Sequence, residues 1–269
     1  FDSRNPLCYP LPMLEFLRDD PKRFFDYALY RVPAVLIALV LHEWAHGYAA
    51  FRLGDPTAKE RGRLTLNPLP HLDPWGAVLM VFLGFGWAKP VPINPAYFKN
   101  PRRDDLIVSI AGVTMNMILF IIFMTLGVAA DLALWKPEMY KYTTLMERLS
   151  FQGDILPYLQ IGYGDYLKEW FANPAILPVL RITTQIAMVN LYIAIFNLIP
   201  VPPLDGSHVL NDLVIKRGLF VTPVVARIGM GALMILSFTG LLGRAITFAA
   251  SGVQLGLFSL FSSLGLFGS

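Results

Sequence analysis

The chain has 269 residues, of which 55% are hydrophobic and only 15% are charged. A soluble domain carries about 25% charged residues, so this composition indicates an integral membrane protein. The net charge of +3 is small and gives no indication of nucleic-acid binding. The single cysteine, Cys8, excludes an internal disulfide framework and a thiolate-rich zinc site, so we expect any metal to be held by histidines and carboxylates.

The first elements of the chain are expected to lie on and then within the membrane. Residues 1–30 contain several acids and no long apolar core, so they predict no cleavable signal. Instead we expect an interfacial segment, with an amphipathic helix over residues 19–30. The apolar stretch Arg31–Phe51 follows and is long enough to form the first membrane span.

A weaker apolar segment comes next, at Gly76–Trp87. It is short, and three prolines follow it within the next eight residues. Proline-rich extended backbone suits a hairpin that lines a cavity, so we favour a re-entrant segment that leads into a small membrane-associated β-hairpin at Trp87–Phe98. A short span is the alternative.

Four further apolar stretches predict later spans, since a span needs roughly 20 residues. They are Leu106–Ala130, Ile182–Leu204, Leu219–Gly243 and Ala245–Ser269. The fold class predicted is therefore an all-α membrane protein, a polytopic helical bundle of about five to six transmembrane segments. We expect residues 31–218 to form its core, with an extracytoplasmic loop at 131–174, and residues 219–269 to form C-terminal transmembrane helices.

A His-Glu-x-x-His sequence lies in the first predicted span, at His42-Glu43-Trp44-Ala45-His46. On a helix this spacing puts two imidazoles one turn apart on the same face, where both can bind one zinc ion. The glutamate beside them is placed to take a proton from a zinc-bound water. Ionisable groups at membrane depth are costly, so this cluster is a candidate functional site. A histidine pair that only makes hydrogen bonds across the bundle is the alternative.

A catalytic zinc ion takes three protein ligands and keeps a fourth position for water, so a third ligand must come from elsewhere. The candidates near membrane depth are His71, Asp73, Asp205, His208 and Asp212. Asp205 is best placed, because prolines at 200, 202 and 203 break the preceding span and such unwinding is tolerated only where it lines a protein interior or a wet cavity. A helix-capping role is the alternative for Asp205. We interpret His71 and Asp73 as loop hydrogen-bonding groups, with a second metal-binding pair as the alternative.

With these two motifs the chain resembles the site-2 protease family of intramembrane zinc metalloproteases. The resemblance rests on the His-Glu-x-x-His span and on Asn197-Leu-Ile-Pro-Val-Pro-Pro-Leu-Asp205-Gly206, and it extends over most of the chain, from Leu36 to Leu210. It implies that His42, His46 and Asp205 bind one Zn²⁺ and that Glu43 is the catalytic acid and base. The Gly-Pro pair typical of the family reads Gly112-Val113 here. No PDZ or CBS domain is visible, so the chain is similar to the minimal bacterial members.

Three asparagines are candidates for active-site support or substrate contact. Asn116 lies in the longest uncharged span, where an amide most often bonds a neighbouring helix but can also stabilise a developing oxyanion. Asn197 is a candidate for holding the broken backbone before Asp205, and Asn94 for contacting substrate backbone. The segment 87–98 is a candidate strand edge for an unwound substrate.

The function predicted is hydrolysis of peptide bonds within or next to transmembrane segments, with a transmembrane protein or peptide as substrate and the lipid bilayer as surroundings. Basic residues after the first span and before the Leu106 span place these loops in the cytoplasm, with the active site toward that side of a bacterial cytoplasmic membrane. One alternative is a prenyl-protein-type membrane zinc protease, but that pattern needs a downstream glutamate and none follows Glu169. The other is a non-proteolytic protein. A metal transporter should show further ionisable groups along a path, but the spans after Asp205 offer only Arg227 and Arg244, and a binding scaffold has no need of Glu43.

Overall fold

The computed structural model describes residues 17–83, 87–150, 155–215 and 223–263. Within these ranges, four helical stretches are long and apolar enough to cross a membrane. They are α2 (Pro21–Arg52), α5 (Pro101–Leu134), α9 (Leu177–Asn197) with the preceding short turn η5 (Pro174–Ile176), and α12 (Leu241–Ser263). The prediction of an integral, helical membrane protein is therefore confirmed.

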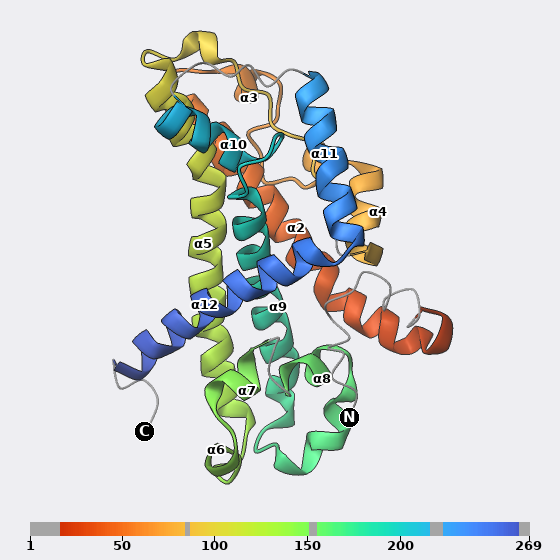
Figure 1. Ribbon diagram of the computed structural model, residues 1–269. Coiled ribbons are helices and arrows are strands. Elements are labelled where there is room, and N and C mark those ends of the chain that lie inside the picture. The colour runs from red at the N-terminus through yellow and green to blue at the C-terminus, as the bar shows by residue number, and fades with distance from the viewer. Residues whose placement is uncertain (1–16, 84–86, 151–154, 216–222, 264–269) are drawn as a thin grey trace.

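Helices α2, α5 and α9 form the centre of the molecule, with α5 and α9 in the most extensive contact and α2 packed on both (Figure 1). Where α2 meets α9, the buried residues Ala34, Val35 and Ala38 pack against Ile186 and Val189. Small side chains let two helices approach closely within a membrane, where van der Waals packing replaces the hydrophobic effect as the source of helix association. Helix α12 crosses this group and adds Ala250 and Phe258 to the larger core around α5 and α9.

Helix α9 ends at Asn197, before the three prolines of the predicted span, because proline has no N–H to continue the helical ladder. After this turn the short helix α10 (Asp205–Leu210) and a π-helical turn (Asn211–Ile215) run beside the beginning of α5. Gly206 lies directly against the carbonyls of Leu198 and Ile199, where a Cβ atom would collide with backbone. The chain therefore folds back sharply on the end of α9 and carries Asp205 with it.

Two differences from the predicted spans concern helix length. The expected interfacial helix over 19–30 is continuous with the first span, because α2 begins at Pro21 and runs for 32 residues through Pro33. The predicted span at 219–243 is represented by α11 (Pro223–Phe238), which has only 16 residues and falls short of a full span. Its predicted first residues, up to 222, lie outside the described residues.

The predicted re-entrant segment is the ten-residue helix α4 (Pro74–Leu83), and residues 84–86 lie outside the described residues. The expected β-hairpin at 87–98 is not present as strands in the part of the chain that the structure describes. A single antiparallel bridge joins Leu72 to Ala88, and the stretch ends in a short 3₁₀ turn, η3 (Pro95–Tyr97). Prolines at 90, 92 and 95 remove the N–H groups that a strand ladder requires, which explains an extended segment without a partner strand.

The two ends of the helical core are built differently. One end carries the loop between α2 and α4, with α3 (Thr57–Glu60) and η2 (Leu69–His71), and also α10. The opposite end is a small domain of short helices between α5 and α9, packed around buried Leu149, Leu156 and Leu159. These helices are α6 (Met139–Tyr142), α7 (Leu145–Leu149), α8 (Leu156–Gln160) and η4 (Tyr163–Trp170).

Candidate active site

Three side chains from two distant parts of the chain meet where α10 folds back against α2 and α5. His42 and His46 lie one turn apart on α2, and both are buried. Their Nε2 atoms are 3.0 Å apart, and Asp205 Oδ2 lies 3.3 Å from each of them. In the part of the chain that the structure describes, this is the one group of three such residues whose ligand atoms are close enough to hold a metal ion.

The contacts of the other ring nitrogens define what the three converging atoms can do. His42 Nδ1 is 2.5 Å from Asn116 Oδ1, and His46 Nδ1 is 2.7 Å from the carbonyl oxygen of Val108. Both partners are acceptors, so each Nδ1 carries the proton and each Nε2 presents a lone pair. Two lone pairs and the buried Oδ2 of Asp205, which accepts no hydrogen bond from the described residues, therefore point at one another. A cation between them removes this repulsion, and two imidazoles with one carboxylate suit zinc.

The absence of a side chain at position 112 lets α5 approach the histidine pair. A Cβ atom at Gly112 would lie within 2.8 Å of His42 Nδ1 and against the ring of His46 as well. Any larger residue would push the imidazoles out of their positions. Position 112 of the Gly112-Val113 pair must therefore be glycine for α5 to pack this closely on the two histidines.

A chain of amides holds His42 in this orientation. Asn190 on α9 donates its side-chain N–H to the carbonyl of Ile186 and accepts a bond of 2.7 Å from Asn116 Nδ2. Asn116 also donates to the carbonyl of Ala38 at 3.3 Å. Both N–H groups of Asn116 are used in this way, so its carbonyl oxygen is the atom that faces His42. The geometry favours orientation of the imidazole over the stabilisation of an oxyanion by this amide.

Glu43 is half-buried on the side of α2 that faces the extended segment 87–98. Its Oε2 atom accepts a hydrogen bond of 2.8 Å from the backbone N–H of Val91. The side chain of Val91 is buried, and a Cβ atom at Gly47 would lie 3.1 Å from it. The segment therefore packs on α2 while it holds the carboxylate.

Two groups outside the predicted site anchor this segment. Asp55 is fully buried, and its Oδ2 accepts a bond of 2.7 Å from the N–H of Asn94 while its Oδ1 accepts from Thr57. At the other end of the segment, Lys89 donates its backbone N–H to the carbonyl of His71 at 2.9 Å. The extended stretch is thus held on both sides of Val91. Sequence reasoning did not identify Asp55, although a lone carboxylate directly after a membrane span was a usable signal.

The remaining third-ligand candidates lie elsewhere. His71 is buried and its Nε2 contacts the carbonyl of Thr65 at 2.9 Å, and Asp73 accepts the N–H of Gly76 at the start of α4. His208 contacts Asp105 at 3.1 Å, and this neighbouring carboxylate raises the pKa of the imidazole. This ion pair ties α10 to α5. Asp212 follows in the π-helical turn.

The two other asparagines predicted to support the site are not brought to the histidines. Asn94 is exposed, and its side chain caps the η3 turn by accepting the N–H of Ala96. Asn197 donates to the carbonyl of Ile193 in its own helix at 3.1 Å. Of the three candidates, Asn116 alone contacts a member of the histidine pair among the described residues.

Comparison with known proteins agrees with this geometry. The model of peptidase family M50 matches residues 30–237, a range that contains both histidines and Asp205. The chain belongs to peptidase family M50. It is 38% identical over 197 residues to a Bacillus subtilis protein named "Putative zinc metalloprotease YwhC", covering 71% of this chain and 74% of that protein. No solved structure matches.

Similarly named proteins called Rip2 share a shorter region. The Rip2 of Mycolicibacterium smegmatis is 34% identical over 107 residues, or 38% of this chain and 39% of that protein. That of Mycobacterium tuberculosis H37Rv is 33% identical over 90 residues, or 31% of this chain and 34% of that protein. This M50 peptidase is therefore a zinc metalloprotease of the site-2 type, and the predicted family, enzyme class and cofactor are confirmed.

Proposed function

We propose that this metalloprotease hydrolyses peptide bonds within or next to the transmembrane segments of membrane proteins. The observation that carries the proposal is the position of the cluster: His42 and His46 are buried, Asp205 is partly buried, and the surrounding helices are long enough to cross a membrane. A soluble substrate has no access to such a position without entering the bilayer. A segment that is itself in the membrane reaches it by lateral movement.

In this proposal Nε2 of each histidine and Oδ2 of Asp205 hold one zinc ion, which when bound activates a water molecule and polarises the substrate carbonyl. Asn116 and the Val108 carbonyl keep the two imidazoles in the tautomer that leaves Nε2 free. Glu43 accepts the proton of the attacking water and later passes it to the leaving amine nitrogen. The N–H of Val91 orients the Glu43 carboxylate for both transfers.

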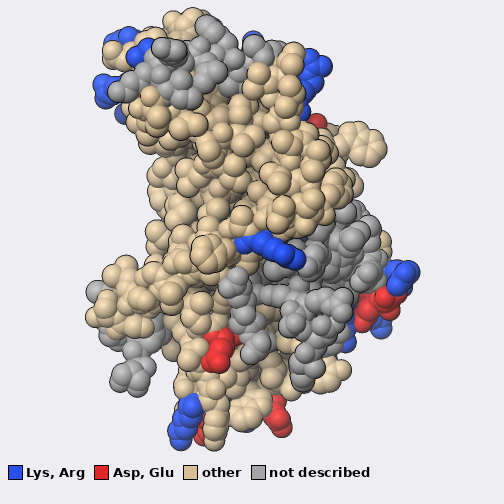
Figure 2. Space-filling model, viewed as in Figure 1, with Lys and Arg blue, Asp and Glu red and all other residues tan. Residues whose placement is uncertain are grey.

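We further propose that the site lies toward the cytoplasmic face of a bacterial cytoplasmic membrane. Figure 2 supports this orientation: in this view the charged side chains at the end that carries α3 and α10 are mostly Lys and Arg, whereas Lys, Arg, Asp and Glu are mixed at the opposite end. Cytoplasmic loops are enriched in Lys and Arg. The domain between α5 and α9 would then face outward.

Replacement of Glu43 by Gln tests the proposed chemistry, because glutamine keeps the size and the acceptor for Val91 N–H but cannot act as a base. We expect zinc to remain bound while cleavage of a single-span membrane substrate falls by about 10²- to 10⁴-fold. Zinc content and cleavage products are to be measured on the same purified sample. Cleavage at the wild-type rate by the Gln variant would overturn the mechanism.

A binding scaffold or metal transporter is the competing function, and the same experiment separates it from a protease. A transporter or scaffold would release no new peptide terminus from any membrane substrate. Its zinc binding or transport would also be indifferent to Glu43→Gln. Mass spectrometry of the products of the wild-type protein decides between the two classes.

A further inference from the structure

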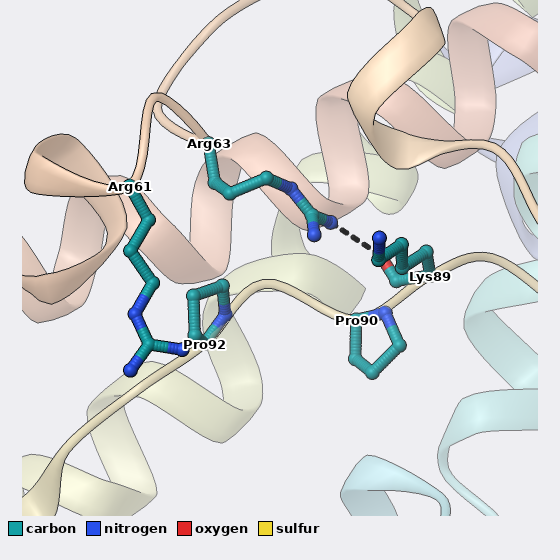
Figure 3. Close-up of a pocket in the computed structure, with 5 residues that line it drawn as sticks. All are labelled: Arg61, Arg63, Lys89, Pro90 and Pro92. Carbon is teal, nitrogen blue, oxygen red and sulfur yellow. Dashed lines mark hydrogen bonds between the residues drawn. The ribbon is translucent and has the colours of Figure 1, made fainter.

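A basic pocket lies between the loop after α3 and the extended segment. Its volume is about 360 Å³, and it is lined by Arg61, Arg63, Lys89, Pro90 and Pro92. Figure 3 shows both arginine side chains reaching from the loop toward the segment, with the guanidinium of Arg61 beside Pro92. Among the described residues no carboxylate lines this pocket, so its three cations give it an uncompensated positive potential.

The pocket is partly preorganised for an anion. Arg63 donates from one terminal nitrogen to the carbonyl of Lys89 at 2.6 Å, which fixes the direction of its guanidinium. Its Nε atom is buried and has no hydrogen-bond partner. Between the two arginines, Gly62 has a φ of +65°, a left-handed turn that favours glycine. The buried Nε is not accessible from the pocket, but a guanidinium held in one direction, with the exposed Arg61 beside it, is a suitable partner for a carboxylate.

The position of the basic pocket relative to Glu43 indicates what it binds. Pro90 and Pro92 line the pocket, and the residue between them, Val91, donates its N–H to Glu43. The pocket is therefore one residue along the segment from the contact with the proposed base. An extended peptide rises about 3.3 Å per residue, so a substrate side chain close in sequence to the cleaved bond is the group expected to reach the pocket.

We infer that the basic pocket binds an acidic side chain of the substrate that lies a few residues from the cleaved bond. This inference rests on the proposed function and adds a sequence preference to it. The two proline rings supply an apolar wall for the methylene groups of a Glu or Asp side chain, and Arg61, Arg63 and Lys89 surround its carboxylate. A lipid phosphate has the same charge, but the location beside Val91 and Glu43 favours a group carried by the peptide being cut.

The test uses the purified, zinc-loaded protein in nanodiscs of neutral phosphatidylcholine. The cleavage point of a single-span peptide is mapped first, and peptides with Glu or Gln at each of the nearby positions are then compared. At one or more positions, we expect kcat/KM for Glu to exceed that for Gln by about three- to tenfold. In the double variant Arg61→Glu and Lys89→Glu, we expect the preference to change to Lys at the same position.

Arg103→Glu is the matched control, because Arg103 is an exposed cation near the start of α5 and does not line the pocket. It should leave the preference for Glu unchanged. Equal rates for Glu and Gln at every position, or a preference that survives in the double variant, would overturn the inference. The double variant is also assayed in nanodiscs that contain an anionic lipid. If it loses activity toward all peptides alike, and only in anionic lipid, the inference is overturned and the pocket is assigned to a lipid phosphate.

A separate binding measurement distinguishes failure of the pocket from failure of the proposed function. Fluorescence anisotropy of the Glu and Gln peptides is measured with the Glu43→Gln protein, which needs no turnover. If the wild-type protein cleaves no peptide, the proposed function fails. The pocket is then supported by tighter binding of the Glu peptide that is lost with Arg61→Glu and Lys89→Glu, and it is rejected by equal binding.

Discussion

Two buried polar clusters lie at opposite ends of the α2–α5–α9 core, and they differ in how their polar atoms are satisfied. In the domain between α5 and α9, Asp131 accepts bonds from Arg148 Nε at 3.0 Å and from Trp135 Nε1 at 2.7 Å. Arg148 also donates to the carbonyl of Thr143 and stacks on Tyr140. Each charge in this cluster has an opposite charge and several hydrogen-bonding partners.

In the cluster of His42, His46 and Asp205 the two histidines are buried and Asp205 is partly buried, but only hydrogen-bond acceptors meet at its centre. Its Nδ1 atoms are paired, while two Nε2 lone pairs and a carboxylate oxygen face one another without a donor. Both clusters contain buried ionisable groups, so burial alone does not separate a structural cluster from a functional one in this chain. The presence or absence of internal compensation does, because an uncompensated cluster requires a ligand from outside.

The largest effect is expected when the uncompensated cluster loses a member. Asp205→Ala removes one of the three proposed protein ligands, so we expect zinc to be lost or bound much more weakly and cleavage to disappear. Metal analysis of the purified protein measures this directly. Asp73→Ala is the matched control, since Asp73 caps α4 and should leave zinc bound. Zinc retained in the first variant and lost in the second would reverse our assignment of the third ligand.

A substitution in the cluster of Asp131 and Arg148, whose charges are paired, should lower the stability of the protein and leave its zinc affinity unchanged. Arg148→Ala leaves Asp131 buried without its charge partner, which typically costs about 3–5 kcal/mol of folding free energy. Thermal or denaturant unfolding in detergent measures the loss, and zinc content per folded molecule should stay normal. The exposed pair of Lys168 and Asp165 offers a control, because Lys168→Ala should change stability by about 0–1 kcal/mol. An Arg148→Ala protein as stable as the Lys168→Ala protein would contradict the comparison.

The same contrast explains which features could be predicted from the sequence. The His-Glu-x-x-His spacing and the proline break before Asp205 carry their chemistry locally, so both ends of the proposed zinc site could be found without a structure. The pairing of Asp131 with Arg148 could not, because both residues lie in or beside a loop with many charges and their contact depends on how α7 folds against α5. Similarly, the partners of Asn116 depend on which face of α5 meets α2.

The backbone around residue 91 shows a second limit of sequence reasoning. Alternating prolines correctly predicted an extended segment, but the same prolines remove the N–H groups from which a paired strand would be built. The N–H of Val91 remains, and its partner is Glu43. A backbone contact of this kind cannot be predicted from the identity of the residue, since every residue except proline has an N–H group that can make it.

Loss of a residue that orients a proposed zinc ligand should lower zinc affinity by an intermediate amount. Asn116→Ala removes the acceptor for His42 Nδ1, and loss of such an orienting group typically lowers metal affinity by about 10- to 100-fold. Competition with a zinc chelator measures the change. Asn197→Ala is the control, because that amide bonds only within its own helix among the described contacts. Equal zinc affinity in the two variants would show that the amide chain does not orient His42.

The smallest expected effect concerns Glu43. This residue belongs to the proposed site, but unlike the three proposed zinc ligands its carboxylate accepts a hydrogen bond from the protein, from the N–H of Val91. Val91→Pro removes the N–H that holds the Glu43 carboxylate, and residue 91 already lies between two prolines that favour extended backbone. We expect kcat to fall by about tenfold, which lies at the lower end of the roughly 1.5–3 kcal/mol that a hydrogen bond to a charged group contributes, because the Glu43 carboxylate itself remains. Val91→Ala keeps the N–H and should retain most activity, and zinc content should be normal in both variants.

Ile93→Pro separates this positioning role from substrate docking on the same segment. If residues 87–98 also accept an unwound substrate by strand addition, loss of the Ile93 N–H should raise KM while kcat stays close to the wild-type value. Ile93→Ala is the size control. Normal kinetics in Ile93→Pro with a reduced kcat in Val91→Pro would mean that the segment serves Glu43 alone. Normal kinetics in both proline variants would remove the segment from the catalytic machinery and leave Glu43 to be oriented by α2.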